Sequence, residues 1–139
     1  METTKKFTSY QDLKRTHAEE LNAFEGIFFA FSDEQFTEGM AKIGYTDQEN
    51  LKDKILSLGA GGYIRKDRSA AFGAMFDRHA EERKQIKAEE KILLEALTYE
   101  LQNHEYCITG DTSDALNALG YTREEIPADI LRKACRAAL

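Results

Sequence analysis

The sequence has no long apolar stretch. Among its 139 residues the longest wholly apolar run, at residues 27–31, has only five members, whereas a membrane-spanning helix needs about 20. The first six residues, Met-Glu-Thr-Thr-Lys-Lys, also lack the apolar core of a secretory signal. We therefore expect a protein that neither crosses a membrane nor is secreted.

Cysteine is scarce as well. Cys107 and Cys135 are the only two cysteines, which is too few for a disulfide framework. No further ligand flanks either cysteine at the spacing of a metal site. Reduced, packed thiols are typical of cytoplasmic proteins, so the sequence predicts a cytoplasmic location and no cofactor.

Motifs that carry catalysis are missing. The chain contains no Gly-x-Ser-x-Gly elbow, no P-loop and no Rossmann fingerprint. His104 and Cys107 are three residues apart, and neighbours this close rarely form a catalytic pair, which also needs a third, orienting group. The sequence therefore predicts no catalytic residues and no enzyme.

Histidine and glutamate pair at helical spacing in three places, namely His17/Glu20, His79/Glu82 and Glu100/His104. Such pairs bind zinc or a dinuclear iron centre in some helical bundles, where Glu precedes His by three residues. The first two pairs have the reverse order. We interpret the pairs as ordinary ion-pairing groups and predict no metal site.

Acidic residues outnumber basic ones, 25 against 19, for a net charge of −6. Affinity for nucleic acid depends on Lys and Arg displacing counterions from phosphates, so an acidic chain is a poor general nucleic-acid binder. The charge suits a partner with a basic groove. It also suits a protein whose surface charge serves solubility.

The most informative stretch is residues 26–46. The apolar run 27–31 is rich in aromatic residues and predicts a buried strand. Ser32 and Gln35 have the spacing of a capping box at the start of a helix, and Gly44 supplies a left-handed end to it. Because Phe28 and Phe29 must point to opposite faces of a strand, the second face needs a helix or a partner to cover it.

Patterns elsewhere predict the remaining elements. Helices are expected at residues 9–24, 112–120 and 128–138, a helical turn capped by Thr46 at 47–52, and two helices of about 15 residues within 70–104. Strands are expected at 54–58 and 63–66, with a short one at 106–108. The predicted fold is a single α+β domain, mainly helical, with a small antiparallel sheet of about three strands covered by helices. Residues 1–6 are predicted to form a flexible tail.

A glycine-rich loop with basic neighbours is the best candidate binding segment. Backbone N–H groups in such loops bind anions, and basic side chains follow directly. The candidate binding residues are Gly61, Gly62, Tyr63, Arg65, Lys66 and Arg68. The alternative, which we favour because the P-loop motif is absent, is a hairpin turn whose outgoing strand carries charge at its edge.

One short motif occurs twice. Residues 40–46 and 116–122 both end a helix at Gly-Tyr-Thr, a pattern that ordinary helix capping explains. A repeated functional motif would instead present Tyr45 and Tyr121 on similar corners. These two tyrosines, with Glu81 and Glu82 of the charged segment 81–91, are the candidate partner-facing residues.

Three segments resemble a group of small proteins carried by mobile elements and phages of gut bacteria: Phe29-Ala-Phe-Ser-Asp-Glu-Gln-Phe-Thr-Glu-Gly39, residues 59–66 and residues 103–107. Some small acidic proteins in that setting inhibit host defence, including anti-CRISPR proteins that occupy a surface of the nuclease Cas9. The resemblance implies a non-enzymatic interaction protein whose partner is a protein, an RNA-guided nuclease. The alternative is a small nucleic-acid or nucleotide-binding module that uses residues 59–68. The oligomeric state stays open.

Overall fold

The structure, a computed structural model, describes residues 3–45 and 51–139. Helices form 67% of the protein and the sheet has three antiparallel strands, which confirms the predicted α+β class. The elements in chain order are α1 (Tyr10–Ala23), β1 (Ile27–Phe29), α2 (Asp33–Lys42), α3 (Leu51–Lys54), β2 (Ile55–Gly59), β3 (Gly62–Arg65), the 3-10 helix η1 (Lys66–Arg68), α4 (Ser69–Gln85), the 3-10 helix η2 (Ile86–Ala88), α5 (Glu90–Asn103), α6 (Tyr106–Thr109), α7 (Ser113–Leu119), the 3-10 helix η3 (Arg123–Glu125) and α8 (Ala128–Ala137).

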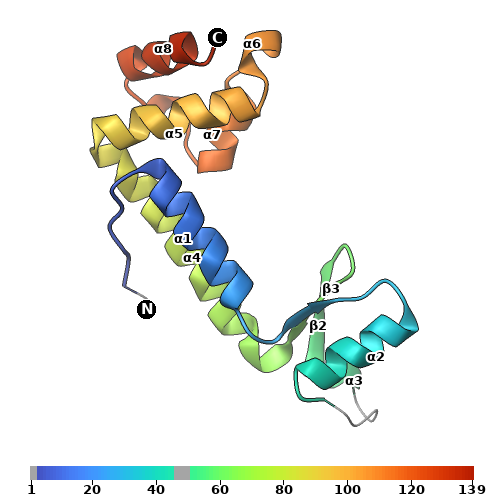
Figure 1. Ribbon diagram of the computed structural model, residues 1–139. Coiled ribbons are helices and arrows are strands. Elements are labelled where there is room, and N and C mark those ends of the chain that lie inside the picture. Colours follow the sequence, from blue (N-terminus) through green and yellow to red (C-terminus); the bar gives the residue numbers. More distant parts are fainter. Residues whose placement is uncertain (1–2, 46–50) are drawn as a thin grey trace. The chain divides into compact units, whose positions relative to one another are not determined.

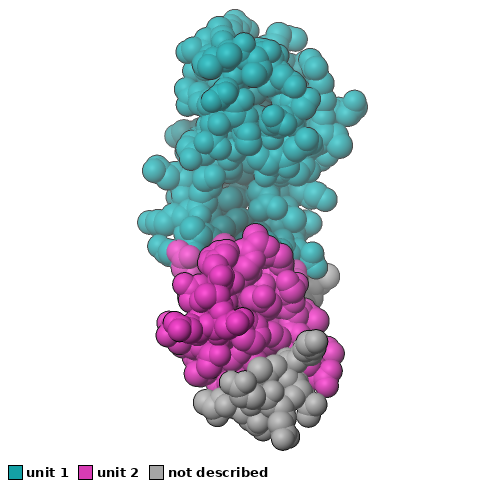
Figure 2. All heavy atoms as spheres, turned by 90° about the vertical axis from the view of Figure 1, so that its right-hand side faces the viewer, with its two compact units in different colours: residues 1–19, 76–139 teal, residues 20–75 magenta. Residues whose placement is uncertain are grey.

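The chain groups into two compact units, which Figure 2 shows in different colours. Unit 1 comprises residues 1–19 and 76–139, and unit 2 comprises residues 20–75. The boundary falls inside α1 and α4, so each of these helices contributes residues to both units. The expectation of a single domain stays a prediction.

Unit 2 is built on the sheet, whose strand order is β1–β3–β2 (Figure 1). β2 and β3 form the hairpin that the sequence predicts around residues 59–62. Gly59 and Gly61 both have a φ of +82°, a conformation that glycine adopts without the steric cost of a Cβ atom. β1 is shorter than predicted, although the backbone N–H of Ala30 still donates to the carbonyl of Gly61 at 2.8 Å.

Helix α2 covers the face of the sheet that bears Phe28. The Phe28 ring stacks on Tyr63, which lies opposite it in the register, with centroids 5.3 Å apart. Phe36 of α2 meets the same ring edge-on at 5.7 Å. Met40 and Ile43 join Phe28 in the core of unit 2. Because successive side chains of a strand point to opposite faces, Phe29 points away from α2.

Two reciprocal hydrogen bonds determine where α2 begins. The Ser32 hydroxyl accepts a hydrogen bond from the Gln35 backbone N–H at 3.2 Å, as the capping-box spacing predicts. The Gln35 side chain accepts one in return from the backbone N–H of Phe31 at 2.8 Å, one residue before the cap. The loop between β1 and α2 is therefore held from both sides.

The motif that occurs twice is a helix end in both copies. Gly44 and Gly120 take left-handed conformations with φ of +97° and +76°. The backbone N–H of the tyrosine that follows donates to the carbonyl five residues earlier, at 2.8 Å for Tyr45 and 2.9 Å for Tyr121. Each glycine N–H donates to the carbonyl three residues earlier at 3.1 Å. These are the two hydrogen bonds of a Schellman motif, so capping explains the repeat.

Unit 1 has its core around α5, which packs against α7 and α8 (Figure 1). Ala96, Leu97 and Leu101 of α5 are fully buried, and Leu97 and Leu101 share one helix face because they are four residues apart. α4 and α5 are separate helices of 17 and 14 residues. This confirms the predicted break in the charged segment 81–91, where η2 buries Ile86.

Residues 106–108, predicted as a strand, belong instead to helix α6. Glu105 takes a left-handed φ of +58° and turns the chain at the end of α5. The backbone N–H groups of Thr109 and Gly110 then donate to the carbonyls of Glu105 and Tyr106 at 3.1 and 2.8 Å. A strand here would need a pairing neighbour, and all three strands of the described chain lie in unit 2. The prediction was wrong because pairing partners are not visible in local sequence.

The described part of the predicted flexible tail, residues 1–6, forms a hydrogen bond, and the flexibility of this tail stays a prediction. The backbone N–H of Lys5, placed in a flexible tail by the sequence, donates to a buried carboxylate oxygen of Glu82 at 2.6 Å. The helical turn predicted at residues 47–52, with its Thr46 cap, begins outside the described residues, which resume at α3.

In the described part of the chain no helix is long and apolar enough to cross a membrane.

The fold makes a prediction at Gly39 of α2. A Cβ atom there would lie 2.1 Å from a ring carbon of Phe28, so Gly39→Ala should lower the free energy of unfolding by about 1–3 kcal/mol through overpacking. Gly73→Ala in α4 is the matched control, because an added Cβ meets no atom within 4 Å. It should raise stability by about 0.5–1 kcal/mol. Urea unfolding measures both, and equal effects would contradict the packing of α2 on Phe28.

Candidate functional sites

The glycine-rich loop places its basic residues in structural contacts. The Arg65 guanidinium binds both carboxylate oxygens of Asp67, at 2.9 and 2.6 Å, and donates to the carbonyl of Ile43 at 2.9 Å. This pairing lowers the pKa of Asp67 and raises that of Arg65. Arg65 also lies over the ring of Tyr45, 5.0 Å from its centroid. It thereby joins the end of β3 to the end of α2.

Arg68 is held in the same way. Its guanidinium lies 4.6 Å from the centroid of the Phe24 ring, and its Nε donates to the carbonyl of Glu25 at 3.3 Å. Lys66 is exposed. Two of the three predicted anion-binding side chains therefore stabilise unit 2, which favours the hairpin interpretation. Binding of nucleic acid by this loop stays a prediction.

The glycines of the hairpin have a different role, because aromatic rings lie against them. A Cβ atom on Gly61 would lie 2.5 Å from the ring of Phe31, and one on Gly62 would lie 3.0 Å from the ring of Phe29. Both rings are well exposed, Phe29 at 64% and Phe31 at 78%. Leu56 and Leu58 of β2 are exposed as well. We call these four residues, Phe29, Phe31, Leu56 and Leu58, the hairpin patch.

Acidic side chains border the hairpin patch at the start of α2. Asp33 and Glu34, the first two residues of α2, are exposed and follow Phe31 by two and three residues. The patch therefore has a negative rim, formed by Asp33 and Glu34, at its Phe31 end.

The four candidate partner-facing residues divide into two groups. Tyr121 is 3% exposed and its hydroxyl donates to the backbone carbonyl of Arg83, and Glu82 is fully buried. Neither faces the surface, which corrects the sequence analysis. Tyr121 belongs to the core of unit 1 and reaches the backbone of α4, and Glu82 is enclosed by donors from α1 and α4. Glu81 is exposed and Tyr45 is half-buried.

Glu82 is the centre of a buried charged cluster in unit 1. Its carboxylate accepts hydrogen bonds from His17 Nε2 at 2.9 Å and from Arg78 Nη1 at 3.0 and 3.1 Å, in addition to Lys5. Burial by itself would raise the pKa of Glu82, but the donors from Lys5, His17 and Arg78 outweigh it and the pKa is lowered. The sequence pairs His79 with Glu82 along one helix, whereas the structure adds His17 from α1, 65 residues away.

The cluster contains three residues, two histidines and a glutamate, of types that bind metal ions. Ligand atoms of His17, His79 and Glu82 lie within 4.8 Å of one another. The two imidazole rings are stacked, with centroids 3.7 Å apart and planes 11° from parallel. Imidazole binds metals through lone pairs in the ring plane, and parallel rings direct those lone pairs side by side instead of toward one point. With both Glu82 oxygens already accepting hydrogen bonds, the arrangement fits an ion-pair network better than a metal centre.

A second buried carboxylate, Glu100, is likewise surrounded by a hydrogen-bond donor and basic side chains. It accepts a hydrogen bond from the hydroxyl of Tyr10 at 2.5 Å and lies 3.4 Å from Lys14 Nζ and 3.5 Å from His104 Nε2. Burial and the bond to Glu100 raise the pKa of Tyr10. The predicted Glu100/His104 pair therefore forms, as part of a network that joins α1 to α5.

Sequence reasoning missed a cavity of about 740 Å³ in unit 1. It lies between α8 and the segment from α6 to the start of α7, and its lining includes Tyr106, Thr112, Ser113, Arg123, Arg132 and Arg136. A signal was present: the polar face of α8 carries Arg132, Lys133 and Arg136 against the single acid Asp129. A basic face on one helix of an acidic chain indicates a local function for that charge.

Comparison with known proteins gives a family. Residues 9–139 match DUF7659, a family of unknown function. The chain belongs to this family. No curated protein and no solved structure matches it. The match spans the helices and strands of both units from α1 to α8, and it assigns neither a reaction nor a partner.

The buried cluster predicts acid sensitivity. Burial lowers the pKa of His17 from 6.5 to about 4, so between these values the unfolded chain binds a proton that the folded chain excludes. Stability must therefore fall as the pH drops from about 6.5 to about 4. His17→Gln keeps an N–H donor for Glu82 but removes this proton uptake, and should flatten the dependence of the unfolding free energy on pH.

Urea unfolding at several pH values in that window measures the slope. His104→Gln is the control, because it removes a histidine of the same unit that lies outside the Glu82 cluster. A wild-type slope in His17→Gln would contradict the role assigned to the buried imidazole.

Proposed function

We propose that this DUF7659 protein is a non-enzymatic interaction protein that inhibits an RNA-guided defence nuclease, and that it binds the nuclease through the hairpin patch. The observation that carries the proposal is the exposure of Phe29 and Phe31, whose rings lie against the glycines of the β2–β3 hairpin. Aromatic residues are enriched at interfaces, where they fill pockets of the partner. Large exposed apolar patches on soluble proteins are associated with binding.

The placement of these rings is a specific feature of the hairpin backbone. Gly61 and Gly62 leave the space that a side chain would fill, and the two phenyl rings occupy it. Each ring therefore packs against the hairpin backbone on one side, and the rest of the ring stays exposed to solvent. Side chains held in this way lose little rotational freedom on binding, which favours affinity.

The negative rim indicates the charge of the partner. Asp33 and Glu34 at the start of α2 are exposed and follow Phe31 of the patch by two and three residues. A complementary surface has an apolar pocket beside basic residues, and complementary charge of this kind sets specificity and association rate. The nucleic-acid channel of an RNA-guided nuclease is positively charged. The resemblance given by the sequence indicates the same class of partner.

The test is direct binding of the purified chain to purified Cas9, with DNA cleavage as the functional readout. We expect binding and slower cleavage by the wild type, and at least about a tenfold loss of affinity in Phe31→Asp because a charge cannot enter an apolar pocket. Ile108→Asp is the matched control, since Ile108 of α6 is 78% exposed, as Phe31 is, and lies outside the patch.

Two results would count against the proposal. If the wild type neither binds Cas9 nor slows cleavage, the assignment to that nuclease is wrong. If Phe31→Asp and Ile108→Asp weaken binding equally, the nuclease binds elsewhere and the hairpin patch is not the interface.

A further inference from the structure

The cavity beside α8 has the dimensions of a ligand site. Its volume of about 740 Å³ lies within the range of about 300–1,000 Å³ that is typical of small-molecule pockets. Its lining comes from helices α6 and α8, from the start of α7 and from η3, all in unit 1. A bound molecule would thus contact segments that the core around α5 already holds together.

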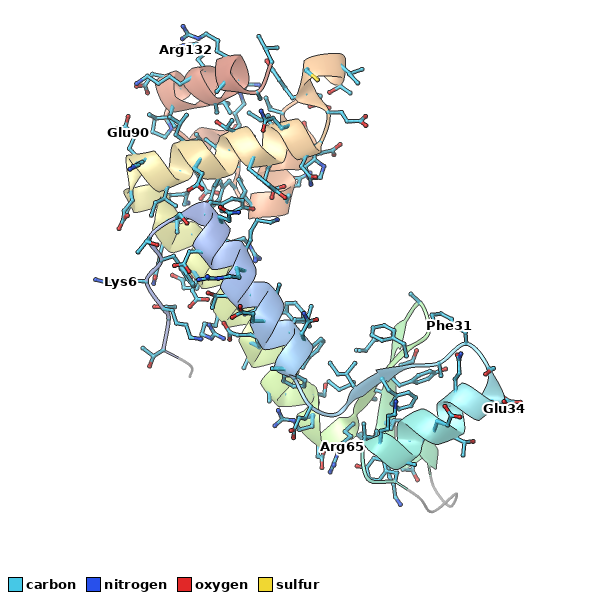
Figure 3. All side chains as sticks on the ribbon, viewed as in Figure 1. Lys6, Phe31, Glu34, Arg65, Glu90 and Arg132 are labelled. Carbon is cyan, nitrogen blue, oxygen red and sulfur yellow. The ribbon has the colours of Figure 1, made fainter. Side chains whose placement is uncertain are left out.

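Three arginines define the chemistry of this cavity. Arg123, Arg132 and Arg136 line it and are exposed, and none of their guanidinium groups forms an ion pair or hydrogen bond within the described parts of the chain. Figure 3 shows Arg132 extending outward from α8. In a protein with 25 acidic residues, three guanidinium groups without acidic partners are not explained by stability.

The positions of two of these arginines are expected to lower the stability of the folded protein. Arg132 and Arg136 are four residues apart on α8, a spacing at which like charges repel along a helix. The acidic side chain in the lining, Asp111, accepts a hydrogen bond from the backbone N–H of Ser113 at 2.9 Å and serves as a local cap. An anionic ligand would relieve the repulsion between the arginines.

The remaining lining suits an organic group next to the anion. Tyr106, Ile126 and Leu131 supply an aromatic ring and apolar side chains, and Thr112 and Ser113 supply hydroxyls. Guanidinium groups bind phosphate oxygens in pairs with a geometry that lysine cannot match. A cavity with arginines on one side and apolar groups on another matches a phosphate attached to an organic body.

The net charge of −6 argues against a polynucleotide as the ligand. Nucleic acids are bound by extended basic surfaces that displace many counterions, whereas here the basic residues gather in one bounded cavity. We propose that this cavity binds a small phosphate ester, with Arg123, Arg132 and Arg136 holding the phosphate and Tyr106 contacting the organic part. This site is independent of the interaction proposed for unit 2.

Calorimetric titration of the full chain with four probes tests the site. The probes are ADP, pyrophosphate, adenosine and a single-stranded oligonucleotide. ADP should bind with a Kd of about 1 mM or tighter at low salt, pyrophosphate more weakly and adenosine weakest. Binding of the oligonucleotide without binding of ADP or pyrophosphate would overturn the proposal in favour of a nucleic-acid site.

Two variants assign the binding to the arginines. Arg132→Gln/Arg136→Gln should weaken ADP binding by at least about tenfold while leaving the protein folded, because both side chains are exposed and unpaired. Lys133→Gln/Lys91→Gln is the matched control, since it removes two charges from α8 and α5 outside the cavity lining. Equal affinity in the two double variants would overturn the site, as would no binding of ADP or pyrophosphate to the wild type.

The two cysteines give an independent readout. Cys135 lines the cavity, whereas Cys107 is exposed and lies outside the lining. ADP should reduce alkylation of Cys135 and leave that of Cys107 unchanged, with both sites read by mass spectrometry. Equal modification of Cys135 with and without saturating ADP would overturn the placement of the ligand in this cavity.

Discussion

The carboxylate of Glu82 is the group on which the arrangement of unit 1 depends. It is fully buried, and a buried charge is costly by several kcal/mol unless hydrogen-bond donors replace its water. The donors come from three places in the chain: Lys5 before α1, His17 in α1 and Arg78 in α4. Any packing that moved one of these segments away would leave the charge short of a donor. The network therefore selects one register between α1 and α4.

Unit 2 depends on a steric constraint instead. The ring of Phe28 lies directly over Gly39, where a Cβ atom has no space, and this contact sets how closely α2 approaches the sheet. Because strand residues alternate between faces, burial of Phe28 under α2 directs Phe29 to the opposite face. The exposed ring is thus a geometric consequence of the buried one. Glycines in the hairpin then provide the support for it.

The composition and the net charge of the chain do not show where its charged side chains gather. Unit 2 places acidic side chains next to the hairpin patch, whereas unit 1 gathers arginines around a cavity. The net charge of −6 has the same sign as the acidic residues of unit 2 and the opposite sign to the arginines around the cavity of unit 1. Two surfaces of opposite sign suit two different ligands, a protein with a basic rim and a small phosphate ester.

The sequence by itself determined what depends on neighbours within a few residues. The Ser32 cap, the glycine helix ends at Gly44 and Gly120, the hairpin turn and the division of residues 70–104 into two helices all follow from local hydrogen bonding and backbone geometry. The tertiary structure decided everything that needs a distant partner. It buried Tyr121 and Glu82, converted residues 106–108 from a strand to a helix, joined His17 to Glu82 and brought Arg123 to the same cavity as α8. Spacing along one helix places side chains on a face, but only the packing of that face determines which of them meet and which stay in water.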